Sequence, residues 1–233
     1  MNSPALDTCR LGQAHQRIHW WAALPSREPR AGLILDRDGV LVDFVDYLHR
    51  PDETRLADDA AQLVATMRDA GVAVGVVTNQ AGIDRSIYGW RDYFAVESEI
   101  DRQLAAMGTA LDGVVACPYH PDFTKDWSER HAYWRKPGPG MIELLIRELN
   151  VCSERCWIIG DHVSDIGAAK AAGLPGAMLV MRGRGKTSLT AATALATPSF
   201  EVAVISDLFE ASSFLIARLG LAVSIASKIQ TRS

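Results

Sequence analysis

Short apolar runs alternate with longer stretches of helical periodicity from about residue 31 onward. This alternation is typical of βα units that stack into a parallel sheet. The run at 72–77 is apolar without interruption, as expected for a strand buried on both faces. The pattern therefore predicts an α/β fold with a mainly parallel sheet and helices on both faces. We expect strands at 31–35, 72–77, 111–116, 156–159, 177–181 and 202–205, and helices at 56–70, 90–107, 141–149 and from 207 onward.

Two segments lie outside this alternation: residues 1–30, and residues 183–199, which are rich in Gly, Thr, Ser and Ala. We expect both at the surface. A long polar loop at 118–134 carries histidines and tryptophans, and loops of that length in compact domains are often functional. The expected organisation is an N-terminal extension (1–30), one α/β domain (31–216) and a C-terminal helix or tail (217–233).

Composition and charge narrow the class of partner. The formal charge of −4 provides no basic field for nucleic acid, so a small molecule is the expected partner. The four cysteines have no framework spacing, which favours a reducing cytoplasm. The apolar tail is interrupted by Arg218, and the run after it is too short to span a membrane. The sequence says nothing of oligomeric state, and a monomer is the default.

Two acids follow the first predicted strand directly. Asp36 and Asp38 come where the run GLIL ends, and Gly39 follows. Ligands of open α/β sheets bind at the carboxyl edge of the strands. Two such acids can share a hard cation while one attacks phosphorus and the other handles a proton. A calcium loop of the EF-hand type is excluded, because the third acid and the glycine that it needs are missing.

Three further segments bring polar groups to the same predicted edge. Thr78 and Asn79 end the second strand, where a hydroxyl and an amide could hold phosphate oxygens. Lys136, in RKPGPGM, can neutralise a carboxylate and an incoming phosphate. Asp161 ends the strand CWIIG, and Asp165 follows one helical turn later. We expect Asp161 to bind Mg²⁺ and Asp165 to support it.

The ordered set DRDGV, TNQAG, RKPGPGM and GDHVSDIGAA resembles the haloacid dehalogenase (HAD) superfamily over residues 31–185. The resemblance implies a Rossmann-like fold and a phosphatase in which Asp36 forms an aspartyl-phosphate and Asp38 is the general acid and base. It implies that Thr78 and Lys136 bind the transferred phosphoryl group. It also implies Mg²⁺ held by Asp36, the backbone carbonyl of Asp38, and Asp161.

YLHRP and TNQAGIDRSIY narrow the resemblance to the capless subgroup that contains heptose bisphosphate and histidinol phosphatases. Too few residues separate the motifs for a cap domain. The implied substrate is a small phosphorylated sugar or polyol, and the leading expectation is removal of the 7-phosphate of a heptose 1,7-bisphosphate. Histidinol phosphate is the alternative. The subgroup implies that Arg135 binds the substrate, and Arg85 and Asn79 are further candidates.

The sequence departs from this subgroup at a zinc loop. Cys117 is kept, but Tyr119, Ala132 and Trp134 occupy the other ligand positions, and neither Ala nor Trp ligates zinc. Cys117 and the two loop histidines could regroup, yet a structural zinc site normally needs four ligands. We expect no zinc and a loop held by its aromatic side chains. His162 also replaces the lysine usual in the subgroup.

Two functions of other classes compete with a phosphatase. A kinase is suggested by RGRGKTS, but a phosphate loop needs Gly at the position of Val180, which lies in a predicted strand. A binding protein without turnover could keep the same fold. The intact pair of Asp36 and Asp38 favours the enzyme.

Overall fold

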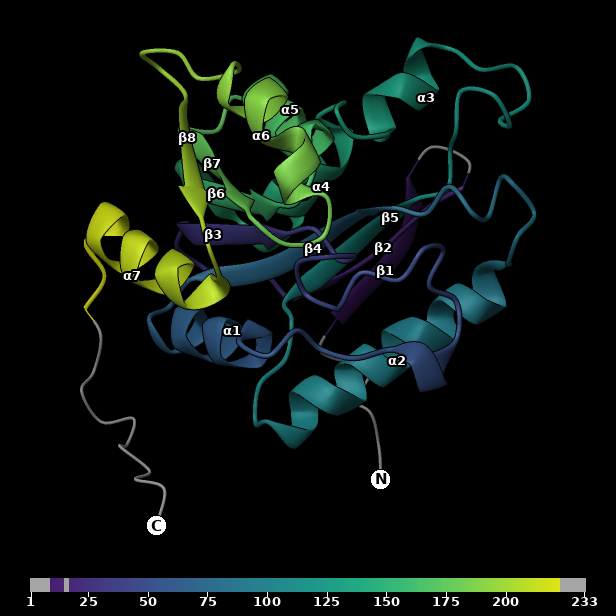
Figure 1. Cartoon of the computed structure of the whole chain (residues 1–233). Coiled ribbons are helices and arrows are strands. Elements are labelled where there is room, and N and C mark those ends of the chain that lie inside the picture. The colour runs from purple at the N-terminus through teal and green to yellow at the C-terminus, as the bar shows by residue number, and fades with distance from the viewer. Residues whose placement is uncertain (1–8, 15–16, 223–233) are drawn as a thin grey trace.

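The computed structural model describes residues 9–14 and 17–222. Eight of its strands form one sheet in the order β1-β2-β5-β4-β3-β6-β7-β8 (Figure 1). The six strands from β5 to β8 are parallel, and β1 and β2 join antiparallel at one end. The strands are β1 (Cys9–Ala14), β2 (Ile18–Ala23), β3 (Arg30–Leu35), β4 (Ala73–Asn79), β5 (Gly113–Cys117), β6 (Val151–Gly160), β7 (Gly176–Val180) and β8 (Glu201–Ile205).

Helices cover both faces of the sheet (Figure 1). Side chains of α1, α2 and α7 belong to the hydrophobic cluster on one face, and those of α4, α5 and α6 to the cluster on the other. The helices are α1 (Ala60–Asp69), α2 (Trp90–Ala106), α3 (Glu129–Trp134), α4 (Gly140–Leu149), α5 (Val163–Ala171), α6 (Gly185–Thr193) and α7 (Leu208–Leu219), with a short 3₁₀ turn η2 (Pro51–Glu53).

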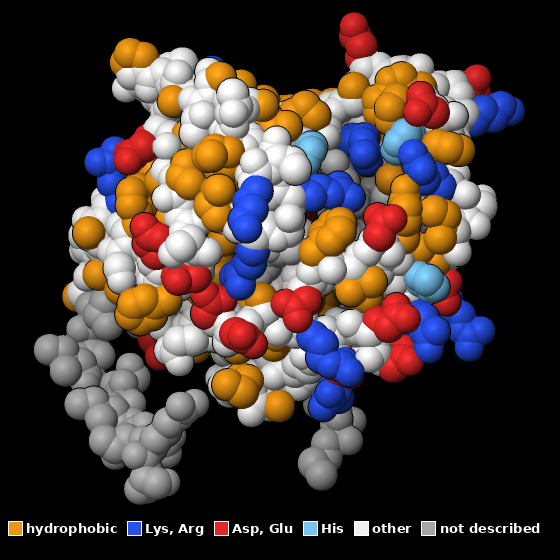
Figure 2. Space-filling model, viewed as in Figure 1, with side chains coloured by type: hydrophobic (Ala, Val, Ile, Leu, Met, Phe, Trp, Pro, Cys, Tyr) orange, Lys and Arg blue, Asp and Glu red, His pale blue; other side chains and the backbone are white. Residues whose placement is uncertain are grey.

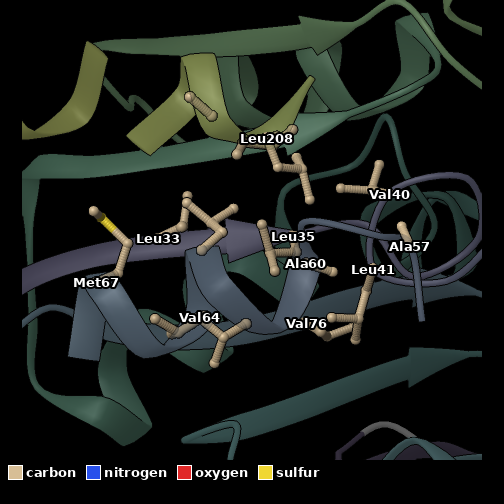
Figure 3. Packing of buried hydrophobic residues seen from close by; sticks show 14 of the residues in the cluster. Leu33, Leu35, Val40, Leu41, Ala57, Ala60, Val64, Met67, Val76 and Leu208 are labelled. Carbon is tan, nitrogen blue, oxygen red and sulfur yellow. The ribbon is translucent and has the colours of Figure 1, made fainter. Parts of the chain in front are cut away.

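The central strand β3 shows why the strands are apolar throughout. Leu33 and Leu35 face the cluster that contains α1, whereas Ile34 faces the opposite cluster. Figure 3 shows Leu33 and Leu35 among side chains of α1, including Val64 and Met67. Because successive residues of a strand point to opposite faces, a strand covered on both sides needs apolar residues at every position.

The α/β fold and each strand expected from residue 31 onward are confirmed. The predicted helices are confirmed as α1, α2, α4 and α7, although α1 begins at Ala60 rather than Leu56. In the described chain only η2 and α1 lie between β3 and β4, and only α2 lies between β4 and β5, which leaves no room for a cap domain there. Among the described residues no helix is both long and apolar enough to cross a membrane. Residues 223–233 of the expected tail lie outside the described part.

The expectation of surface chain was wrong for parts of both segments. Ile18 and Ala22 of β2 are fully buried, because this strand pairs with β5 and extends the sheet. In the second segment Gly185–Thr193 is a helix, whose Ser188 and Ala192 are buried. The polar loop at 118–134 likewise contains a helix, α3. Small and polar residues concealed α6, because such residues carry little hydrophobic periodicity.

Candidate active site

The carboxyl ends of β4, β3 and β6 lie side by side and carry the predicted residues. Asp36 directly follows β3, and its N–H donates to the carbonyl of Ile159 in β6 (2.9 Å). Leu35 is in register with Val76 of β4 on one side and with Ile159 on the other. Parallel pairing therefore brings the segments after these three strands to one edge, where ligands of such sheets bind.

Lys136 connects two of the carboxylates at this edge. Its Nζ lies 2.8 Å from Asp36 Oδ1, 2.8 Å from Asp165 Oδ1 and 2.8 Å from the carbonyl of Val77. The residue is only 3% exposed. Burial lowers the pKa of Lys136, but the carboxylates of Asp165 and Asp36 outweigh it, so the pKa lies above its ordinary value. The ammonium therefore stays charged inside the site.

Asn79 fixes the position of that lysine. Its Nδ2 donates to the backbone carbonyl of Lys136, and its Oδ1 accepts from the N–H of Lys136, both at 3.1 Å. The side chain also lines the cavity described below. The amide expected to bind substrate thus also ties the end of β4 to the lysine segment.

Three carboxylates form a group that could hold a metal ion. Asp36, Asp161 and Asp165 each offer an oxygen, and these atoms lie within 4.8 Å of one another. Burial raises the pKa of Asp36, which the nearby carboxylates of Asp165 and Asp38 raise further and Lys136 lowers. Burial also raises the pKa of Asp161 to about 6. Since one ammonium faces three acids, the group fits a hard divalent cation, which prefers oxygen ligands.

Asp161 is held by a turn that follows β7. The N–H of Arg184 donates to Asp161 Oδ2 (2.8 Å), and a Cβ added to Gly183 or Gly39 would overlap that same oxygen. Both glycines have positive φ, 52° and 86°. Only glycine allows the two backbone segments to come so close to this carboxylate.

Asp38 lies outside the three-carboxylate group, but it lines the same cavity. Its carboxylate accepts from the guanidinium of Arg37 and from Nε2 of Gln80 (3.0 Å). Thr78 is fully buried, and its hydroxyl accepts from the same Gln80 amide (2.8 Å). The Thr78 side chain is absent from the described lining of the cavity.

A cavity of about 470 Å³ opens over these groups. Its inner end is formed by Asp36, Asp38, Lys136 and Asp161. Loops from several parts of the chain supply the rest of the wall, including Tyr47, Arg85, His120, Arg135, His162 and Arg184. Figure 2 shows Lys, Arg and His side chains gathered around the hollow in the upper half of the visible face.

Two arginines make one side of the outer cavity wall electropositive. Arg135 donates to the carbonyl of Tyr119 (2.8 Å), and Arg85 lies 3.3 Å from Nε2 of His120 and over the ring of Phe123. Burial lowers the pKa of His120, and Arg135 and Arg85 lower it further by repulsion. The structure thus brings both predicted arginines to one side of the cavity.

Aromatic packing holds the altered zinc loop. Tyr119 and His131 are buried, with their ring centroids 4.6 Å apart, and Trp127 stacks on His131. Nδ1 of His131 lies 2.9 Å from the hydroxyl of Ser128. Burial raises the pKa of Cys117 to about 12, which keeps its thiol protonated. The expected aromatic packing is confirmed, whereas the absence of zinc stays a prediction.

Sequence reasoning missed two residues that shape the site. Arg37 lies between the paired acids, and its side chain is buried against Asp38. A basic residue inside an otherwise apolar and acidic segment is a signal that could have found it. Arg184 contacts Asp161 through its backbone, and a backbone contact between distant segments leaves no trace in residue type.

Comparisons with known proteins agree with this geometry. The HAD-hydrolase-like family model matches residues 133–211. The D-glycero-beta-D-manno-heptose-1,7-bisphosphate 7-phosphatase of Photorhabdus laumondii is 34% identical over 152 residues, which cover 65% of this chain and 81% of the relative. The Yersinia pestis protein of the same name is 32% identical and covers 67% of this chain and 83% of the relative.

One solved structure is similar to the chain in both fold and sequence. The D,D-heptose 1,7-bisphosphate phosphatase of B. bronchiseptica, complexed with magnesium and phosphate, superposes with a TM-score of 0.70 at 29% identity. The match covers 81% of this chain and 99% of the other. The chain therefore belongs to the haloacid dehalogenase (HAD) superfamily and is a phosphatase of the group that contains the heptose bisphosphate phosphatases.

Proposed function

We propose that the protein removes the 7-phosphate of D-glycero-D-manno-heptose 1,7-bisphosphate through an aspartyl-phosphate on Asp36, in the synthesis of bacterial surface polysaccharides. One observation carries the proposal: Lys136 Nζ lies 2.8 Å from Asp36 at the inner end of the cavity. A buried ammonium at that distance orients the carboxylate and offsets the repulsion between it and an incoming phosphate. The enzyme is expected to work in the cytoplasm as a monomer.

The reaction has two steps. A carboxylate oxygen of Asp36 forms a bond to phosphorus, and the ester oxygen leaves with a proton from Asp38. Asp38 then takes a proton from water, which attacks phosphorus and frees Asp36 and inorganic phosphate. Lys136 binds the transferred phosphoryl group in both steps. The same role for Thr78 stays a prediction, because its side chain is buried and outside the described lining of the cavity.

Mg²⁺ is the proposed cofactor. Asp36, Asp161 and the backbone carbonyl of Asp38 would hold it, with Asp165 in support through its contact with Lys136. When bound, the ion would draw negative charge from the phosphoryl oxygens. The excess of acids over the single ammonium supports this assignment, as does the magnesium in the related B. bronchiseptica enzyme.

The electropositive outer wall favours a bisphosphate. Arg135 and Arg85 both lie near His120 in the wall of the cavity, and the proposal has the second phosphate of the substrate extend toward them. Arginine is well suited to phosphate because its planar fork donates two parallel hydrogen bonds. Histidinol phosphate, the alternative substrate, carries an ammonium group, which these arginines would repel. The related enzymes named above act on a heptose bisphosphate.

A panel of phosphate esters tests the proposal. The purified protein with Mg²⁺ is given the heptose bisphosphate, histidinol phosphate and several sugar monophosphates, and released phosphate is measured. We expect the bisphosphate to give the highest kcat/KM, and Asp36→Asn to abolish turnover. Full turnover by Asp36→Asn would refute the nucleophile, and no release from any ester would favour a binding protein.

The second phosphate is tested separately. Arg135→Met should raise KM for the bisphosphate roughly 10- to 100-fold, because it removes a charge-assisted contact of roughly 1.5–3 kcal/mol. The same variant should change KM for a monophosphate much less. Equal changes for both esters would show that Arg135 does not bind the second phosphate.

A further inference from the structure

Arg37 is a buried cation that follows Asp36 in the sequence and forms ion pairs with Asp38 and Glu97. The residue is 1% exposed, and its guanidinium donates hydrogen bonds to Asp38, Glu97 and the carbonyl of Leu48. Nε lies 3.2 Å from both carboxylate oxygens of Asp38, and Nη2 lies 3.0 Å from Oδ1. Nη1 donates to Glu97 at 3.1 Å. The planar fork of Arg37 therefore fixes the plane of the Asp38 carboxylate as well as its distance.

Helix α2 anchors this guanidinium from the side opposite Asp38. Glu97 of α2 supplies the second carboxylate, and Tyr93, one turn earlier, lies under the guanidinium at 5.6 Å. Both residues are largely buried. Because a packed helix holds these contacts, Arg37 cannot swing away from Asp38 without leaving Glu97 unpaired in the core.

Gln80 holds Asp38 from another direction. Its Nε2 donates to Asp38 Oδ2 at 3.0 Å, and its Oε1 accepts from the hydroxyl of Tyr88 at 2.6 Å. Two side chains therefore hold Asp38: Arg37, which is anchored by Glu97, and Gln80, which is anchored by Tyr88. Its carboxylate remains 22% exposed at the cavity wall, where a leaving group would need a proton.

A purely stabilising role explains this network poorly. Replacing a buried ion pair by apolar side chains is often neutral or stabilising, so stability alone gives little reason for a buried arginine here. The network ends on the carboxylate that faces the cavity. We propose that Arg37, anchored by Glu97, is a positioning residue that holds the Asp38 carboxyl in place to transfer its proton to the leaving oxygen. This inference rests on the proposed function, in which Asp38 is the general acid.

Leaving groups of different basicity test the inference. The alkoxide of a sugar must gain a proton as it leaves, whereas the phenolate of p-nitrophenyl phosphate leaves without one. The main variant is Arg37→Met with Glu97→Gln, which removes the guanidinium without leaving the carboxylate of Glu97 unpaired in the core. We expect kcat/KM for the heptose bisphosphate to fall roughly 10²-fold or more, the usual size of general acid catalysis. For p-nitrophenyl phosphate it should fall less than about fivefold.

Three further variants complete the experiment. Asp38→Asn should show the same selective loss, and Arg37→Lys should recover part of the sugar phosphate activity because it keeps the charge without the fork. Arg68→Met is the matched control, because Arg68 also forms an ion pair, with Asp112 at 3.2 Å. Asp112 directly precedes β5, and neither residue lines the cavity, so both activities should stay unchanged.

The outcomes separate the two claims. A selective loss in both the Arg37 double variant and Asp38→Asn supports the positioning role. If Asp38→Asn is selective while the double variant loses both activities equally, Arg37 is only structural and the inference is overturned. If Asp38→Asn itself loses both activities equally, the general acid role of Asp38 fails and the inference falls with it.

Discussion

Gly183 shows how one residue without a side chain can maintain the proposed site for a cation. It lies in the turn after β7 with φ of 52°, and a Cβ there would overlap Oδ2 of Asp161. The next N–H, that of Arg184, donates to the same oxygen. The orientation of the Asp161 carboxylate thus depends on the close approach of this backbone.

Alanine at this position should weaken the binding of Mg²⁺. We expect Gly183→Ala to raise the Mg²⁺ concentration for half-maximal activity roughly 10-fold or more, since a displaced carboxylate loses a charged ligand contact of roughly 1.5–3 kcal/mol. The measurement is a Mg²⁺ titration of turnover. The matched control is Gly173→Ala, since Gly173 also has a positive φ (70°) but no neighbour within 4 Å of the added Cβ.

Backbone strain alone should affect both glycine variants similarly, by roughly 1 kcal/mol of stability. Equal Mg²⁺ requirements in the two variants would therefore contradict the role given to Gly183. The position of the Asp161 carboxylate would then not depend on this turn.

The sequence predicts well that residues directly after the strands of a parallel sheet lie close together. Asp36 and Asp161 follow neighbouring parallel strands, so their proximity depends only on the order of the strands. Contacts that depend on exact distances between loops are different. The close approach of Gly183 to Asp161 and the ion pair of Arg37 with Glu97 need the finished tertiary structure, so residue type alone does not predict them.

Strand β2 is one of the elements that the sequence analysis missed. Its segment IHWWAA lies in a polar N-terminal region, and the pairing with β5 is antiparallel and remote in sequence. Alternating βα units predict only parallel neighbours joined by helices. An antiparallel strand added from outside that pattern leaves no regular signal, which explains why residues 1–30 were expected at the surface.

Removing the buried side chain of β2 should destabilise the protein. Ile18 is fully buried in the same cluster as Val115 of β5, so Ile18→Ala would leave a cavity. We expect a loss of about 2–5 kcal/mol in the free energy of unfolding, measured by urea denaturation. Leu24→Ala is the control, since Leu24 is 56% exposed and its loss should cost much less. A similar small loss in both variants would show that β2 adds little to the sheet.

At the scale of the whole molecule, the residues that stabilise the fold and the residues proposed to carry out the reaction lie in different places. Two hydrophobic clusters lie on opposite faces of the sheet and extend over nearly all its strands. The charged groups gather at one edge, under loops that leave the cavity open. A loop near the cavity, around Tyr119 and His131, is packed by aromatic rings. We therefore expect the fold to have little need of a metal, whereas the proposed reaction depends on one.

Removal of metal should accordingly stop turnover and leave the fold intact. EDTA is expected to abolish phosphate release, and Mg²⁺ to restore it, because Asp36 and Asp161 would lose the cation that they share. The Tm of the protein should fall by only a few degrees, because removing a ligand that binds only the native state takes away only the stability that its binding adds. Metal analysis of the purified protein should find well under one equivalent of zinc. Stoichiometric zinc, together with unfolding of the loop on chelation, would show that Cys117 and the loop histidines bind a metal after all.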